Sequence, residues 1–313
     1  MHPTTRFLTL CLCAAGWSAT DSVTTMASRP LPMELGGFFT YDLAAPATRW
    51  ENGDVPLALS WMELSARVPV ADHLVGAITL LSKDGPRDIR IWQCVAAWED
   101  SGTTIVAGQQ NFHHGLLTTR LVSNPLHWDS AWRNAPGLEV SRTGGSWTVG
   151  IGVASPLRSD PDSSGPAKSD PSGSGYVDWI PAEGSVVRLS GAAARQWRDF
   201  DAAANLAMGP LLLDGEWFGR FRDAGTDLYA GSGGIAFQTG PWTVGTRYDR
   251  LTIDGGETWQ GRTSAGGVLQ FWQAMFAGAE LSRTDRGAWG LDFQVGLTSH
   301  MKVPGFTPSQ PGR

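Results

Sequence analysis

Apolar and polar residues alternate with a period of two in segments of about ten residues along most of the chain. In the segment LALSWMELSARV, for example, Met62, Leu64 and Val68 fall on one face of an extended strand, whereas Glu63 and Arg67 fall on the other. Clusters of Gly, Pro, Asp and Asn separate the segments, and helical periodicity is hard to find. This pattern predicts a sheet with one apolar face and one polar face.

Two architectures produce such a sheet: a soluble sheet with one face on a core, and a membrane barrel whose apolar face contacts lipid. The lengths of the links between strands distinguish them. The short links are 69–72, 99–102, 143–146 and 239–242. The long links, in the alternate positions of the strand order, are 44–55, 111–135, 156–184 and 254–262. Short turns at one end and long loops at the other predict an antiparallel transmembrane β-barrel of about 14 strands, within a range of about 12–16.

The composition favours the membrane barrel and excludes nucleic-acid binding. The 313 residues include 15 tryptophans, several of them at the ends of predicted strands, where their rings would anchor in the two interfaces of a membrane. The alternative is that these rings fill a soluble core. A formal net charge of -6, with no Lys/Arg-rich run, gives no basic surface for a phosphate backbone.

The sequence divides the chain into three parts. Residues 1–20 have Arg6 before an apolar core and small residues after it, which predicts a secretory signal peptide. Residues 33–300 form the predicted outer-membrane barrel, and residues 301–313 form a C-terminal tail. If the signal peptide is removed, Cys94 is the one cysteine left, so no disulfide can form within the chain.

The polar faces of the predicted strands supply the candidate pore lining. Charges of both signs on these faces would meet across a water-filled interior, where they would orient zwitterionic or anionic solutes. The candidate pore-lining residues are Glu63, Arg67, Arg90, Asp214, Glu216, Arg220, Arg222, Arg247, Asp249 and Asp292.

The link 111–135 holds the adjacent histidines His113 and His114, followed by Arg120 and His127. A metal site needs converging ligands, but neighbouring residues of an extended chain point apart. A catalytic site needs a nucleophile and a base within reach, and no Gly-x-Ser-x-Gly or similar signal accompanies the pair. These four residues are therefore interpreted as part of a polar constriction loop or a plain loop, with no metal, no cofactor and no catalytic group.

Four stretches of the chain carry a resemblance to a known family: MELGGFFTYDL, LALSWMELSARVPVADHLVGAITLL, TIVAGQQNFHHGLLTTRLVSNPL and GLEVS. They resemble the LbtU-type siderophore porins, a family related to substrate-specific outer-membrane porins. The positions that match the family pattern are Ala107, Gly108, Phe112, Gly115, Thr118 or Thr119, Val122, Ser123, Asn124, Pro125 and Leu126. The chain departs from the family at Gln109, where an Arg is usual, and at His127, Trp128 and Asp129, where the family has an acidic cluster. The resemblance implies an outer-membrane barrel that passes siderophores.

Together these features predict a channel rather than an enzyme. The expected function is passive uptake of small polar solutes through the bacterial outer membrane, and the resemblance adds iron–siderophore complexes to those solutes. The expected partners are outer-membrane lipid, the solute or siderophore and, in a homo-oligomer, further copies of the chain. Two alternatives stay open: an outer-membrane barrel enzyme of the lipase or deacylase type, and a structural or adhesive barrel. A pore conducts ions, whereas a hydrolase turns over ester or acyl substrates.

Overall fold

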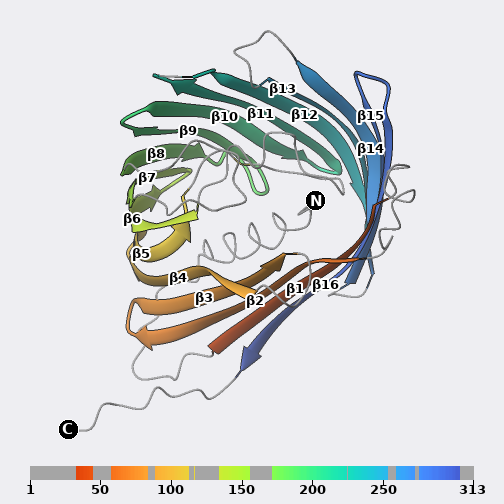
Figure 1. The fold of residues 1–313 in the computed structure, drawn as a ribbon. Coiled ribbons are helices and arrows are strands. Elements are labelled where there is room, and N and C mark those ends of the chain that lie inside the picture. The colour runs from red at the N-terminus through yellow and green to blue at the C-terminus, as the bar shows by residue number, and fades with distance from the viewer. Residues whose placement is uncertain are drawn as a thin grey trace, which may run out of the picture.

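The computed structural model describes residues 33–44, 58–83, 89–112, 116, 134–155, 171–223, 225–252, 259–271 and 275–303. These residues form sixteen antiparallel strands in one closed barrel, in which each strand pairs with its neighbours in sequence and β1 pairs with β16 (Figure 1). The first eight strands are β1 (Met33–Ala44), β2 (Ala58–Ala71), β3 (Leu74–Lys83), β4 (Ile89–Asp100), β5 (Thr103–Asn111), β6 (Asn134–Gly144), β7 (Trp147–Ala154) and β8 (Ser172–Trp179). The other eight are β9 (Val186–Ala194), β10 (Trp197–Met208), β11 (Leu211–Arg222), β12 (Leu228–Thr239), β13 (Trp242–Thr252), β14 (Gln260–Phe271), β15 (Met275–Thr284) and β16 (Trp289–Val303). Among the described residues, no helix is long and apolar enough to cross a membrane.

The two faces of the barrel wall differ in polarity, as the alternation in the sequence predicts. On β13, the side chain of Val244 is 54% exposed on the outer face, whereas Arg247 and Asp249 on the inner face are 2% and 0% exposed. On β7, Ile151 and Val153 likewise lie exposed on the outer face. Apolar residues outside and charged residues inside reverse the arrangement of a water-soluble protein, and this reversal suits a wall that contacts hydrocarbon.

The two ends of the barrel differ in the lengths of their connections. At one end, here called the short-turn end, the connections are 72–73, 101–102, 145–146, 180–185, 209–210, 240–241 and 272–274. At the other, the long-loop end, they are 45–57, 84–88, 112–133, 155–171, 195–196, 223–227, 253–259 and 285–288. The tight turn at 101–102 holds Ser101 and Gly102 at φ values of 46° and 81°, the left-handed conformation that two-residue hairpins need. The four longest connections, 45–57, 112–133, 155–171 and 253–259, all lie at the long-loop end as predicted, whereas 195–196 at the same end has only two residues.

Sixteen strands is the upper limit of the predicted range, and β8 is one of the two strands beyond fourteen. The long link predicted over 156–184 is wrong from Ser172 onward, because SGSGYVDW forms β8. Its Gly and Ser residues look like a loop in sequence, but Ser174, Tyr176 and Asp178 alternate on the inner face of a strand. The next connection, 195–196, joins β9 and β10 through two residues and is not among the links that the sequence predicts. At the C-terminal side, β16 continues to Val303, three positions into the segment 301–313.

Aromatic side chains lie on the outer face near both ends of the barrel. At the short-turn end, Trp98, Trp147, Trp179 and Trp242 are exposed, and the rings of Trp147 and Trp179 stack with their centroids 6.1 Å apart. At the long-loop end, the exposed aromatic residues include Trp289. Two such belts are expected where a barrel wall passes through the two interfaces of a membrane.

Candidate functional site

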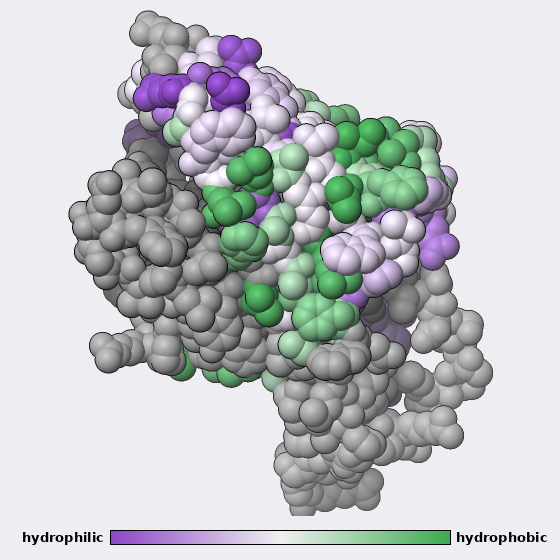
Figure 2. Space-filling view, turned by 90° about the vertical axis from the view of Figure 1, so that its right-hand side faces the viewer, coloured by the Kyte–Doolittle hydropathy of each residue, from purple (hydrophilic) through white to green (hydrophobic). Residues whose placement is uncertain are grey.

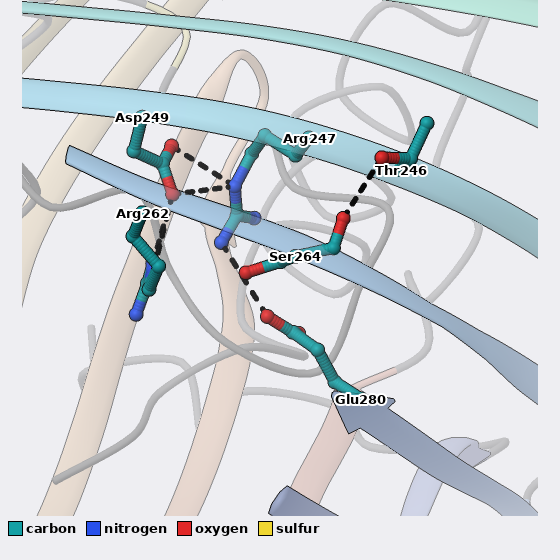
Figure 3. Close-up of polar contacts among 6 residues, drawn as sticks. All are labelled: Thr246, Arg247, Asp249, Arg262, Ser264 and Glu280. Atoms are coloured by element: carbon teal, nitrogen blue, oxygen red, sulfur yellow. Dashed lines mark hydrogen bonds and ion pairs between the residues drawn. The ribbon is translucent and has the colours of Figure 1, made fainter. Parts of the chain in front are cut away.

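Arg247, Asp249, Arg262 and Glu280 form a buried ionic cluster on the inner faces of β13, β14 and β15 (Figure 3). Arg247 Nε donates to the Asp249 carboxylate at 3.0 Å, and Arg262 Nη2 donates to Asp249 Oδ2 at 3.0 Å. Arg247 Nη2 also lies 3.9 Å from Glu280 Oε1. The strand geometry explains the arrangement, because Arg247 and Asp249 are two positions apart on one strand and Asp249 is directly opposite Arg262 on the next. A carboxylate this deeply buried is tolerable because two guanidinium groups contact it.

A second cluster lies on β8 and β9. Arg188 donates from Nε and Nη2 to the two carboxylate oxygens of Asp178, each at 2.6 Å. The Arg188 guanidinium also lies 4.7 Å from the centre of the Tyr176 ring, and the Tyr176 hydroxyl donates to Glu139 on β6 at 3.4 Å. Gly150 on β7 makes room for this ring, because a Cβ at that position would collide with it. The arginine is therefore held by a forked ion pair and an aromatic face together.

A third cluster lies on β10 and β11. Arg220 donates from Nε and Nη2 to the two carboxylate oxygens of Asp199 at 2.8 and 2.9 Å. Its guanidinium lies 5.5 Å from the centre of the Phe218 ring, a side chain that is 0% exposed. Each of the three clusters thus joins neighbouring strands through their inner faces.

The charges of the inner wall are not evenly distributed. On β10 to β16 the described inner-face side chains include seven carboxylates: Asp199, Asp201, Asp214, Glu216, Asp249, Glu280 and Asp292. The same strands carry four inner-face arginines: Arg220, Arg222, Arg247 and Arg262. On β2 to β9 the described inner-face charges balance, with Glu99, Glu139 and Asp178 against Arg67, Arg90 and Arg188. The wall from β10 to β16 is therefore acid-rich among the side chains that the structure describes.

The structure places nine of the ten candidate pore-lining side chains on the inner face. These nine are Arg67, Arg90, Asp214, Glu216, Arg220, Arg222, Arg247, Asp249 and Asp292. The tenth, Glu63, occupies an inner-face position opposite Leu81, and its side chain lies outside the described part. The four loop candidates, His113, His114, Arg120 and His127, also lie outside the described residues.

The expected arrangement of these charges needs correction. The sequence predicts opposite charges that face each other across a wet interior, but Arg220 and Arg247 bind carboxylates beside them on the wall, and both side chains are buried. Pairing with a neighbour is favoured because a desolvated guanidinium needs a carboxylate within hydrogen-bond distance.

Several members of these clusters were missed in the sequence. They are Glu139, Tyr176, Asp178, Arg188, Asp199, Arg262 and Glu280. For Asp199 a signal is present, because Asp199 and Asp201 alternate with Phe200 in WRDFD. Asp178 has a weaker signal, because the Gly and Ser residues of SGSGYVDW predict a loop at this position.

The first residue after β5, Phe112, has its side chain on the inner face of the barrel wall. Phe112 is 5% exposed and packs with Ala135 and Ala154 on the inner wall. Its ring lies over two inner-face glycines, since a Cβ at Gly137 would be 2.5 Å from the ring and a Cβ at Gly152 would be 3.0 Å from it. Gly137 on β6 and Gly152 on β7 thus leave the space that the ring occupies, and we call this space the seat of Phe112. No group of three or more His, Cys, Asp or Glu side chains in the described ranges is placed to hold a metal ion.

No family model matches the chain, and no curated protein matches it in sequence. Solved structures do match its fold. OmpF of Salmonella typhi, in a complex with daunomycin, superposes with a TM-score of 0.61 at 9% identity, covering 87% of this chain and 97% of that chain. An anion-selective porin from Comamonas acidovorans superposes with a TM-score of 0.59 at 12% identity, covering 87% and 98%. The outer-membrane channel DcaP of Acinetobacter baumannii gives 0.53 at 11%, covering 87% and 96%. The chain therefore has the fold of the outer-membrane β-barrel porins.

Proposed function

We propose that the protein is a passive channel of the bacterial outer membrane for small polar solutes. One observation carries this proposal: a closed sixteen-stranded barrel whose wall is apolar outside and charged inside. A closed barrel satisfies the hydrogen bonds of every strand, so it can cross hydrocarbon. A charged interior lowers the free-energy barrier for a polar solute that passes through the barrel.

The charge of the wall favours cationic and zwitterionic solutes. The acid-rich strands β10 to β16 carry seven described carboxylates against four arginines, so their inner face attracts cations. Iron–siderophore complexes are the finer proposal, which rests on the sequence resemblance to the LbtU-type porins. Among such complexes, those with a net positive charge are expected to pass fastest.

A swelling assay on proteoliposomes tests the function. Liposomes that contain the refolded protein should swell in isotonic arginine faster than in isotonic glutamate, and slower as the solute becomes larger. Liposomes without protein give the background rate. If liposomes with the protein swell no faster than the background rate in any solute, the channel is rejected. Hydrolysis of an ester substrate by the same protein would favour the barrel-enzyme alternative.

The segment 112–133 is proposed to narrow the pore, with His113, His114, Arg120 and His127 near the constriction. The support is the position of Phe112, whose side chain packs against the inner wall at the start of this segment. If these histidines face the pore, protonation below about pH 6.5 adds positive charge and shifts ion selectivity toward anions. The change of His113→Gln together with His114→Gln should flatten this pH dependence between about pH 5 and 7.5, because Gln does not titrate. An unchanged pH profile would show that the two side chains point away from the pore.

A further inference from the structure

Two arginine–tryptophan pairs lie on the outer face of the barrel at its long-loop end. The Arg250 guanidinium lies 4.4 Å from the centre of the Trp259 ring, and the Arg283 guanidinium lies 5.2 Å from the centre of the Trp289 ring. Both arginines are exposed, and no described carboxylate forms an ion pair with either of them. We call these four residues the arginine rim. An arginine stacked on an indole keeps its N–H edge available for an anion.

The two pairs are neighbours on the barrel wall. Arg250 on β13 is opposite Gly261 of β14, and Arg283 on β15 is opposite Thr263 of the same strand. One strand therefore separates the arginines, which places their backbones roughly 10 Å apart. Between them a carboxylate intervenes, because Asp285 lies where a Cβ on Gly261 would be. Figure 2 shows this side of the molecule, with hydrophobic side chains across its middle and hydrophilic ones gathered toward its edges.

Among the residues that the structure describes, the outer-face and connecting side chains at the two ends of the barrel differ in net charge. At the long-loop end, the described outer-face and connecting residues include five arginines: Arg195, Arg198, Arg250, Arg283 and Arg286. Three carboxylates accompany them: Asp223, Asp227 and Asp285. At the short-turn end the balance among the described residues is reversed, with Arg142 against Asp72, Asp100 and Glu183. A membrane that is anionic at one surface would therefore interact unequally with the two ends.

We propose that the arginine rim binds the phosphate groups of a phosphorylated glycolipid in the outer leaflet. The two guanidinium groups would each donate a forked pair of hydrogen bonds to a phosphate, and the indole rings would lie at the level of the headgroups. Asp285 opposes the anion by like-charge repulsion and limits the affinity. This inference rests on the proposed location of the barrel in the outer membrane, but it does not depend on whether the pore conducts.

A lipid-binding titration tests the rim. The refolded full-length protein, in a zwitterionic detergent, is titrated with fluorescent lipid A that carries both phosphates, with dephosphorylated lipid A, and with inorganic phosphate as a competitor. The variant Arg250→Gln with Arg283→Gln should bind phosphorylated lipid A roughly tenfold more weakly, because it loses charge-assisted hydrogen bonds. The control Arg142→Gln removes an exposed outer-face arginine at the opposite end and should bind as the unchanged protein does. Asp285→Asn should bind more tightly.

The outcomes separate this inference from the proposed function. Equal binding of phosphorylated and dephosphorylated lipid A, or unchanged binding by the double variant, would overturn the phosphate site. Displacement of the lipid by inorganic phosphate at similar concentration would show a site for free phosphate instead of a lipid. Heat-dependent migration of each variant on SDS gels verifies its folding. A barrel that binds lipid A through the rim but does not swell liposomes would keep this inference and reject the channel.

Discussion

At the scale of single residues, Asp249 shows how the inner wall holds buried charge. Its carboxylate is fully buried and accepts hydrogen bonds from both Arg247 and Arg262. Removal of that carboxylate would leave two guanidinium groups of which one, Arg247, is only 2% exposed. Glu280, 3.9 Å from Arg247, would be the carboxylate left in this cluster, and a buried charge that loses its hydrogen-bonded partner costs more than the loss of one hydrogen bond.

The variant Asp249→Ala should therefore lose about 3 kcal/mol of stability or more. The measurement is the urea concentration at which the refolded barrel loses its heat-modifiable band on an SDS gel. The control is Asp223→Ala, because Asp223 and Arg198 form an exposed pair at 3.8 Å whose loss should cost less than about 1 kcal/mol. Similar midpoints for both variants would contradict the buried cluster.

At the scale of elements, the seat of Phe112 joins β6 and β7 to the segment that follows β5. A Cβ on Gly137 would collide with the carbonyl oxygen of Val153 and with the Phe112 ring. Gly144, on the same strand, has open space around its Cβ position. These two glycines provide a matched pair of substitutions.

Gly137→Ala should destabilise the barrel by about 1–3 kcal/mol, the usual cost of overpacking, and should displace Phe112 from the wall. Gly144→Ala should change stability by less than about 0.5 kcal/mol, as surface substitutions usually do. Urea midpoints of the two variants check the difference. If Gly137→Ala is as stable as Gly144→Ala, the ring does not lie on that glycine.

The sequence predicts most strands of this barrel, but not all of them. The alternation is clear on β2, β13 and β16, where apolar residues occupy every second position. It is hidden on β8, because small residues such as Gly173 and Gly175 occupy its outer positions and give no apolar signal. The prediction fails here for a physical reason. The outer face of a strand tolerates glycine, and a strand with glycines at its outer positions shows no alternation of apolar and polar residues.

The sequence predicts on which face of the sheet the charged residues of the candidate site lie, but it does not predict which residues form ion pairs with them. Alternation alone places Arg220 and Arg247 on the inner face, and the structure has them there. Their partners depend on which residues stand opposite one another on neighbouring strands, and this register is not written in the sequence of one strand. Asp199 was missed for that reason, although it is directly opposite Arg220.

At the scale of the whole molecule, the sorting of loop lengths predicts the orientation of the barrel. Barrels of this kind carry short turns on the periplasmic side and longer loops outside. The connection 155–171 joins β7 to β8 at the long-loop end, so an epitope inserted at Ser163 should be detected by antibody on intact cells. An insertion after Gly145, in a short turn, is the control and should be detected after the outer membrane is permeabilised. The reverse result would mean that the barrel is inverted.

The most direct test of the channel is the current through a planar bilayer that contains the refolded protein in a KCl gradient. The acid-rich inner wall, with seven described carboxylates against four arginines on β10 to β16, predicts stepwise increases in conductance and a reversal potential whose sign shows preference for K⁺ over Cl⁻. A reversal potential that favours Cl⁻ would contradict the role given to that wall. Heat-modifiable, folded protein that adds no conductance to the bilayer would contradict the channel itself.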